Sequence, residues 1–522
     1  NIVRTPFYRQ NLVLRAMRAP DDQSERTKLL GDLLVRESGG AGGKGKGKSK
    51  AGRGGATVVY VTFQKTATVV AEGLRERGID ARAYHAGMPA LERAEVQDWF
   101  MGTPEGESPV IVGTIAFGMG LDKSNVRRIY HFNLPRSPED LAQQARSQGW
   151  LPAGRDGGCG QCLTLVSPAD LPQLKALVQG NTPSITAVRG LLGALFAEEG
   201  RGRVDFSMYE LSQALDTKEL VLKTMLAHLQ MAGYARETTS FFEAATAALT
   251  PRDAEGWLRH EERARQGHAL APGADELLEL ISAKKKVKWA TLNIRSTAET
   301  LGVSKLEVLR LLQSLSDDGL IITGKPGKIR SRYKILRYPT SSEDIEQIAV
   351  KLHQEALKLE ERELERLQTV VEILCSEDGG QVSSRLSRYF GDTEQTIASA
   401  ENFADAPSQQ GDDGVMSTSR DPHLLQLPPL SAVLDPIPPP SENEVDQRWV
   451  TVTQLIARGG GGEGGGHQLP VDDPYLLARF AAGIRTPRIS KLGLWKLPEF
   501  GCCEGLPFPK LLERARVAAG LV

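Results

Sequence analysis

The sequence has no run of eighteen apolar residues and no charged-then-apolar leader, so we expect neither a membrane span nor a secretory signal. It has no charge imbalance either: 64 basic residues offset 65 acidic ones, so bulk charge does not indicate a nucleic-acid partner. Cysteine is scarce, and five in 522 residues argue against a disulfide scaffold and for a reducing compartment. Glycine and proline are plentiful, and their tracts predict linkers between three or more domains.

Two apolar runs, at 110–123 and 126–135, flank a glycine hinge. Their β-branched clusters, bounded by Gly and Pro, predict buried parallel strands. The first run contains Thr-Ile-Ala-Phe-Gly-Met-Gly-Leu-Asp-Lys, the second contains His131 before Leu-Pro, and Ala-Gly-Arg-Asp-Gly follows at 153–157. In this order the segments resemble motifs V and VI in the second RecA-like lobe of RecQ-family DNA helicases.

The resemblance implies a fold that is multidomain α/β plus α. A RecA-like parallel-sheet lobe is expected at 1–180, with a low-complexity insertion at 36–55. Within that insertion, 42–49 formally satisfies the Walker A pattern. No apolar strand leads into it and no helix pattern follows, so a flexible basic insertion explains it better than a phosphate-binding loop.

The resemblance also implies a half-site for ATP with Mg²⁺. Arg155 matches the arginine that reaches the γ-phosphate, a role that suits a permanently charged, bidentate guanidinium. Gln143 and Arg146 are the other candidates from motif VI, while Gly120 and Asp122 match motif V positions near the nucleotide. Three residues are expected to contact DNA: Tyr84 and His85 in a Tyr-His-Ala-Gly turn, and Thr114 in motif V.

The sequence departs from the family pattern in two ways. Seven residues, 146–152, separate Gln143-Gln144-Ala145 from Ala153, where the family motif is continuous. The first arginine of motif VI is therefore displaced or missing, through either an insertion or a mistranslated stretch. The first lobe, with its P-loop lysine and Asp-Glu-x-His motif, is not in these residues. We therefore expect a C-terminal part of a longer enzyme, inactive alone and partnered by that missing lobe.

Helix pairs followed by strands predict two winged-helix-like modules, at 181–250 and 275–340. In the second module, residues 319–322 are expected to pair with 333–336 across a wing. Between Ile281 and Arg337, 13 basic residues face 4 acidic ones, a local net charge of +9. Such a patch attracts phosphates, or is simply a solvated basic face. We expect DNA contact through four wing residues: Lys325, Lys328, Arg330 and Arg332.

The rest of the chain is predicted to be a long helix and a helical segment at 341–392, a disordered Pro/Gly-rich linker at 393–470, and a small helical module at 471–522. Ile345, Leu352 and Leu359 are among the residues expected on the apolar side of the long helix. Cys159 and Cys162 have zinc spacing, but no second pair follows nearby, so we expect a buried strand and no metal.

The function that follows by resemblance is part of an ATP-dependent 3′-to-5′ DNA helicase acting in recombination and repair. It would be nuclear in a eukaryote and cytoplasmic otherwise. Two alternatives stay open: a non-catalytic DNA-binding relic, and an RNA helicase lobe. The Phe-Gly-Met-Gly-x-Asp-Lys signature and the winged-helix patterns count against the RNA alternative.

Overall fold

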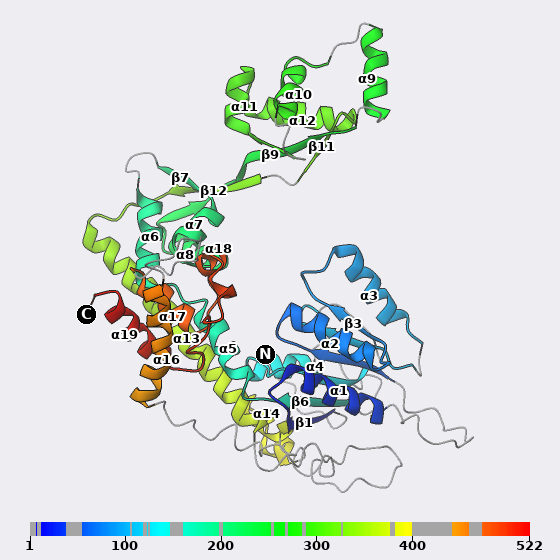
Figure 1. Cartoon of the computed structure of the whole chain (residues 1–522), viewed down its shortest axis with the longest axis vertical. Coiled ribbons are helices and arrows are strands. Elements are labelled where there is room, and N and C mark those ends of the chain that lie inside the picture. Colours follow the sequence, from blue (N-terminus) through cyan, green and yellow to red (C-terminus); the bar gives the residue numbers. More distant parts are fainter. Residues whose placement is uncertain are drawn as a thin grey trace.

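A six-stranded parallel sheet forms the N-terminal lobe of the computed structural model (Figure 1). The structure describes residues 7, 12–37, 55–104, 107–117, 123, 126–146, 160–197, 202–251, 255–266, 270–283, 289–324, 327–375, 382–398, 441–458 and 472–521. The strand order in the sheet is β1 (Leu12–Arg18), β6 (Gly160–Val166), β5 (Val126–His131), β2 (Ala56–Tyr60), β4 (Val110–Gly113) and β3 (Ala81–Tyr84). The predicted parallel-sheet lobe is thus confirmed.

Both faces of this sheet are covered by helices. One core packs the sheet against α1 (Gln23–Glu37) and α2 (Gln64–Glu76). The other packs it against α3 (Ala90–Gly102), α4 (Pro138–Arg146), α5 (Asp170–Gln179), α13 (Ser342–Leu374) and α14 (Val382–Tyr389). Central strands with helices on both sides are mostly apolar, and all five residues of β2 are buried.

A second sheet joins two helical modules. Around one core lie α6 (Ile185–Phe196), β7 (Arg203–Phe206), α7 (Met208–Ala214), α8 (Glu219–Met231) and β8 (Ala235–Glu237). Around another lie β9 (Phe241–Leu249), α9 (Glu255–Arg265), α10 (Ala274–Ser282), β10 (Ala290–Asn293), α11 (Ile294–Leu301), α12 (Lys305–Asp317) and β11 (Ile321–Thr323). Strand β12 (Gly327–Ile335) belongs to both modules: its first half pairs with β9, and its second half pairs with β7 and β8.

The predicted wing pairing is therefore wrong. Ile321–Thr323 pairs with β9, and the Tyr333–Ile335 end of β12 pairs with β7 and β8. The second helical module sits at the end of a two-stranded arm made by β9 and β12, well separated from the lobe (Figure 1). Local pattern finds the strands but not their partners, because β9 pairs with β12 about eighty residues later. The predicted domain limits remain predictions.

The predicted long helix is confirmed as α13, 33 residues from Ser342 to Leu374. Ala349 and Leu352 near its start lie in the core of the first helical module, and Leu367 to Leu374 lie in the core of the lobe. Its middle spans the interval between the two bodies, so Leu359, predicted to lie on the apolar side of the helix, is 56% exposed. The helix thus holds the lobe and the first module together.

The C-terminal module packs α16 (Glu442–Arg458), α17 (Pro474–Ala481), α18 (Pro487–Lys491), the short η3 (Leu494–Lys496) and α19 (Phe508–Ala518) around one core. The predicted helical tail is confirmed, but the prediction of disorder is wrong for 442–458. Val445, Trp449 and Val452 recur there at helical spacing and are buried against the module. Among the described residues, no helix is long and apolar enough to cross a membrane.

Candidate functional site

The carboxyl ends of the parallel strands bring the predicted DNA-contacting residues together. Tyr84 ends β3, and Thr114 follows β4, its neighbour in the sheet. The backbone N–H of Thr114 donates to the carbonyl oxygen of Tyr84 at 3.3 Å. The ring of Tyr84 packs edge-on against Phe117, with centroids 4.9 Å apart, and so fixes the loop that follows β4. In sheets of this class, ligands bind outside the carboxyl ends of the strands.

His85 lies in a tight turn directly after Tyr84. Its Nε2 lies 3.4 Å from Thr68 Oγ1, and its buried Nδ1 has no hydrogen-bond partner among the described residues. A Cβ at Gly87 would meet the end of the flexible Gln64 side chain and would lie 3.3 Å from His85 Nδ1, so the turn packs closely against the start of α2. Gln64 and Thr68 also border this turn, from the start of α2, and were not predicted from the sequence.

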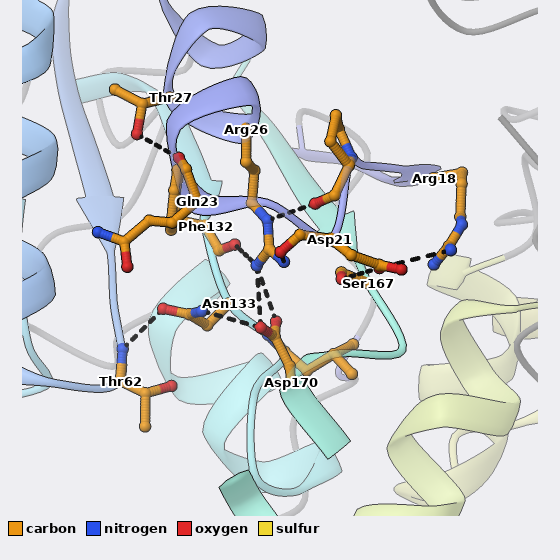
Figure 2. Close-up of polar contacts among 12 residues, drawn as sticks. Arg18, Asp21, Gln23, Arg26, Thr27, Thr62, Phe132, Asn133, Ser167 and Asp170 are labelled. Carbon is orange, nitrogen blue, oxygen red and sulfur yellow. Dashed lines mark hydrogen bonds and ion pairs between the residues drawn. The ribbon is translucent and has the colours of Figure 1, made fainter. Parts of the chain in front are cut away.

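A buried ion pair stabilises the same edge of the sheet (Figure 2). Arg26 Nη1 of α1 lies 2.9 Å from Asp170 Oδ1 at the start of α5, and both side chains are almost fully buried. Arg26 also donates to the carbonyl oxygens of Phe132 and Pro20, each at 3.0 Å. The network therefore ties the loops after β1 and β5 to α5, and it was not predicted.

Asn133 extends this network to a third strand. Its Nδ2 donates to Asp170 Oδ1 at 3.1 Å, and its Oδ1 accepts the backbone N–H of Thr62, which follows β2, at 3.2 Å (Figure 2). The backbone N–H of Leu134 donates to the other oxygen of Asp170 at 2.9 Å. A buried carboxylate needs such partners, and here Arg26 of α1 and the loop after β5, through Asn133 and Leu134, supply them.

His131 ends β5 beneath this edge and is 1% exposed. Its Nδ1 lies 3.0 Å from Thr164 Oγ1 of the adjacent strand β6. Burial lowers the pKa of His131 to about 3, so the imidazole is neutral at physiological pH. Cys162 lies beside it in β6, as the buried-strand prediction expected, and burial raises the pKa of its thiol. Neither side chain is a titrating switch under ordinary conditions.

Only part of the predicted nucleotide half-site can be located. Gln143 lies on α4 and is exposed, and Arg146 is the last residue of that helix. Gly120, Asp122 and Arg155 lie outside the described residues, as does the side chain of Arg146. Lys123, directly after Asp122, is buried and donates to the carbonyl oxygens of Met101 and Thr103, at 3.3 and 3.2 Å. Lys123 thus anchors the end of motif V to the C-terminus of α3, where cations are favoured.

No Mg²⁺ ligand set can be assigned to the described residues. In that part of the chain, no three His, Cys, Asp or Glu side chains come together in a way that could hold a metal ion. The nucleotide site therefore stays a prediction that rests on motif VI.

The two predicted wing arginines that the structure describes are ion-paired. Arg332 Nε lies 2.7 Å from Asp205 Oδ1, and the guanidinium lowers the pKa of that carboxyl. Arg330 Nε lies 2.9 Å from Glu243 Oε2. Their charges are balanced locally, which the composition of the segment could not reveal, because both acids lie outside it. Lys325 and the side chain of Lys328 fall outside the described residues, so their role stays a prediction.

Comparison with known proteins identifies the lobe. Residues 46–146 match the family model described as "Helicase conserved C-terminal domain". Over these residues the lobe is similar to a helicase C-terminal domain, in agreement with its parallel sheet.

Two relatives indicate which helicase family the lobe resembles. The chain is 32% identical over 177 residues to "ATP-dependent DNA helicase Q-like 5" of Arabidopsis thaliana, over 33% of this chain and 19% of that protein. It is 37% identical over 126 residues to "ATP-dependent DNA helicase RecQ" of Pasteurella multocida, over 24% of this chain and 19% of that protein. The lobe is therefore similar to the C-terminal helicase region of RecQ-family proteins. The matched region spans about a fifth of the length of these relatives.

A solved structure of the C-terminal domain of the DEAD-box protein Dbp5 is also similar, at 20% identity and a TM-score of 0.24. The match covers 33% of this chain and 85% of that one.

Proposed function

We propose that this chain is the C-terminal part of an ATP-dependent DNA helicase that moves 3′ to 5′ along one strand and acts in recombination and repair. The observation that carries the proposal is the carboxyl edge of the parallel sheet, where the turn at Tyr84 and His85 is hydrogen-bonded to Thr114. These residues match the positions at which RecQ helicases are expected to grip the tracking strand. In a eukaryote the protein would act in the nucleus.

The edge offers groups that suit a sugar-phosphate backbone. Hydroxyl groups, such as those of Thr114 and Tyr84, and backbone N–H groups are common donors to phosphate oxygens, and they position the strand without selecting its sequence. The Arg26–Asp170 network holds the neighbouring loops in register, so that movement of the lobe moves the whole edge. Such a grip suits an enzyme that must move along any sequence.

Nucleotide chemistry requires a second lobe. ATP and Mg²⁺ would be held mainly by that lobe, and Arg155 would reach the γ-phosphate from this one, with Gln143 and Arg146 beside it. We therefore propose that the isolated chain has no ATPase activity, because an arginine cannot stabilise the transition state unless other groups hold the phosphates.

The two helical modules on the second sheet are proposed to be winged helices that contact duplex DNA. The β9–β12 arm carries the second module away from the lobe, a suitable arrangement for reaching the duplex ahead of the tracked strand. Because Arg330 and Arg332 are engaged with carboxylates, Lys325 and Lys328 are the wing residues to which we assign phosphate contact.

A second candidate function is a DNA-binding relic without catalysis. It is favoured by one observation, the seven residues between Ala145 and Ala153 that interrupt the arginine motif. Replacing 146–152 with Gly-Arg, which restores the family spacing, tests this alternative against the first.

The deciding experiment measures DNA-stimulated ATP hydrolysis by this chain fused behind the first lobe of a RecQ helicase. If the fusion turns over, Arg155→Ala should reduce the rate by about three to five orders of magnitude, because that is the contribution of an arginine finger. DNA binding should stay close to normal. Exposed Arg136, paired on the surface with Asp140, is the matched control, and Arg136→Ala should leave the rate unchanged. A fusion that neither hydrolyses ATP nor gains activity on repair of 146–152 would support the relic.

A further inference from the structure

The C-terminal module carries a basic and aromatic surface to which no role has been given above. Trp495 of η3 is 37% exposed, although most tryptophans in proteins are largely buried. The guanidinium carbon of Arg485 lies 4.2 Å from the centroid of its ring, and Lys496 Nζ lies 5.6 Å from it. Lys491, at the end of α18, is also exposed. These four residues are named the Trp495 surface.

The charge of this surface is not balanced locally. From Pro474 to Pro498 the chain has five basic residues and no acidic one, and two of the five, Arg479 and Arg488, are ion-paired with Asp216 and Asp473 from outside this segment. Arg485, Lys491 and Lys496 form no ion pair with a carboxylate among the described residues. The arginines at the base of the wing differ, because Asp205 and Glu243 neutralise them. The Trp495 surface is therefore the stronger positive feature, in a chain whose net charge is −1.

The aromatic and basic groups are held in place. Arg485 Nε donates to Ser490 Oγ at 3.1 Å, which fixes the plane of the guanidinium over the indole. Leu494, the neighbour of Trp495, is fully buried in the core of the module. Gly493 adopts a positive φ of 70°, which turns the chain sharply into η3. A preorganised platform loses little entropy when a ligand settles on it.

The module is also fixed to the rest of the protein. Arg479 Nη1 lies 3.2 Å from Asp216 Oδ2 in a buried ion pair, and its Nη2 donates to the carbonyl oxygen of Thr182 at 2.7 Å. The backbone N–H of Arg488, in the same helix as Lys491, donates to the other oxygen of Asp216 at 2.8 Å. α18 thus contacts α7 of the first helical module, and the two lie together in Figure 1.

We propose that the Trp495 surface binds single-stranded DNA. A base stacks on the exposed indole or on the guanidinium plane of Arg485, and Lys491 and Lys496 neutralise the flanking phosphates. This pairing of an aromatic platform with unpaired cations suits a strand whose bases are free to unstack, and suits a duplex poorly. The inference rests on the proposed function, and it adds a second contact for the separated strand, away from the lobe.

The test measures binding of a fluorescent oligothymidylate to the full chain by anisotropy. Stacking on an aromatic side chain is worth about 1–3 kcal/mol per base, so Trp495→Ala should weaken binding by about 5- to 150-fold. Trp495→Phe, which keeps a stacking face, should recover much of the loss. Lys496→Ala should reduce the slope of log affinity against log salt by about 0.7, the value for one phosphate contact on a single strand. Arg485→Ala should weaken binding, because it removes the second plane on which a base can stack.

Arg516→Ala is the matched control for charge. Arg516 is exposed on α19, which lies on the other side of the module from α18 in Figure 1. Its loss should leave the affinity within about twofold, since a distant charge is screened at physiological salt. Thermal melting checks that each variant folds, and exposed Trp495 is replaceable without opening the core.

Three outcomes would overturn the proposal. Unchanged affinity for oligothymidylate in both Trp495→Ala and Arg485→Ala would show that the surface does not bind single-stranded DNA. An equal loss of affinity in Arg516→Ala, or an equal loss of affinity for blunt duplex DNA, would show that the surface acts only through nonspecific charge. Competition by polyglutamate as strong as that by oligothymidylate would assign the surface to an acidic polypeptide. The ATPase of the two-lobed fusion is read separately, so a failure of the Trp495 surface and a failure of the proposed helicase are distinguishable.

Discussion

Two buried arginine–aspartate ion pairs have different structural roles in this protein. Arg26 and Asp170 lie within the lobe, 2.9 Å apart, and their remaining hydrogen bonds come from neighbouring strands and loops. Arg479 and Asp216 lie 3.2 Å apart and connect segments separated by 263 residues, the C-terminal module and the turn between α7 and α8. The first pair holds one fold together, and the second joins two. A buried ion pair is weak support for net stability, but removing one partner leaves an unpaired charge.

The environments of the two aspartates also differ. Asp170 is the first residue of α5, where the helix dipole favours a carboxylate, and backbone and amide groups donate to it. Asp216 has a left-handed backbone, with φ of 47°, and burial raises the pKa of its carboxyl despite Thr486, Arg479 and the backbone of Arg488. The joint between modules is therefore the more costly arrangement and the easier one to release.

The largest effect is expected for Arg26→Ala. It leaves Asp170 buried without its cation and should lower the free energy of unfolding of the lobe by about 3–5 kcal/mol. Chemical denaturation followed by circular dichroism measures it. The surface pair Arg136–Asp140 is the control, and Arg136→Ala should cost at most about 1 kcal/mol. Equal losses in the free energy of unfolding of the two variants would mean that the buried Arg26–Asp170 pair matters no more for stability than a surface pair.

Arg479→Ala should have a smaller and more local effect. The C-terminal module keeps its own core, so the variant should release α17 and α18 from the first helical module, at a cost of about 3 kcal/mol, without unfolding the lobe. Hydrogen exchange by mass spectrometry should show faster exchange at the contacts of Thr182 and Asp216 and unchanged exchange in β2 and β4. Faster exchange throughout the lobe would contradict the division between the two pairs.

The smallest effect is a pH dependence of the contact made by Asp216. Because the pKa of Asp216 is raised on folding, its contribution to docking is fully present below its unfolded pKa of about 4 and declines as pH rises through the folded pKa. Arg479→Ala removes an opposing positive charge and extends that decline to higher pH. Lowering the pH from about 7 to about 5 should therefore recover part of the docking in Arg479→Ala. Asp216→Asn in the same background should abolish that recovery.

The sequence was a good guide to the lobe because the central strands β2 and β4 are almost wholly apolar, and the resemblance supplied the order of the segments. It was a poor guide to the second sheet, where β12 divides its length between three partners. Charge counting over 281–337 could not show that Arg330 and Arg332 are neutralised by acids from β7 and β9. Which cations are free to bind depends on tertiary neighbours that lie outside the segment counted.

Both buried arginines left a signal that was available in the sequence. Arg26 precedes Leu30 and Leu33 at helical spacing, so it falls on the apolar face of α1. Arg479 stands among five apolar neighbours of α17, all of them buried. A charged residue on an apolar stripe needs a partner, although only the fold reveals which one.

Helix α13 has a mechanical consequence. With 33 residues it is about 50 Å long at 1.5 Å per residue, and it is embedded in the lobe at one end and in the first helical module at the other. A tilt of about 5° at the lobe would displace its far end by about 4 Å, given that length. The first module and the β9–β12 arm beyond it would swing with that end. The helix would thus transmit a small rotation of the lobe to the first module as a displacement close to the spacing of about 3.4 Å between successive nucleotides of one strand.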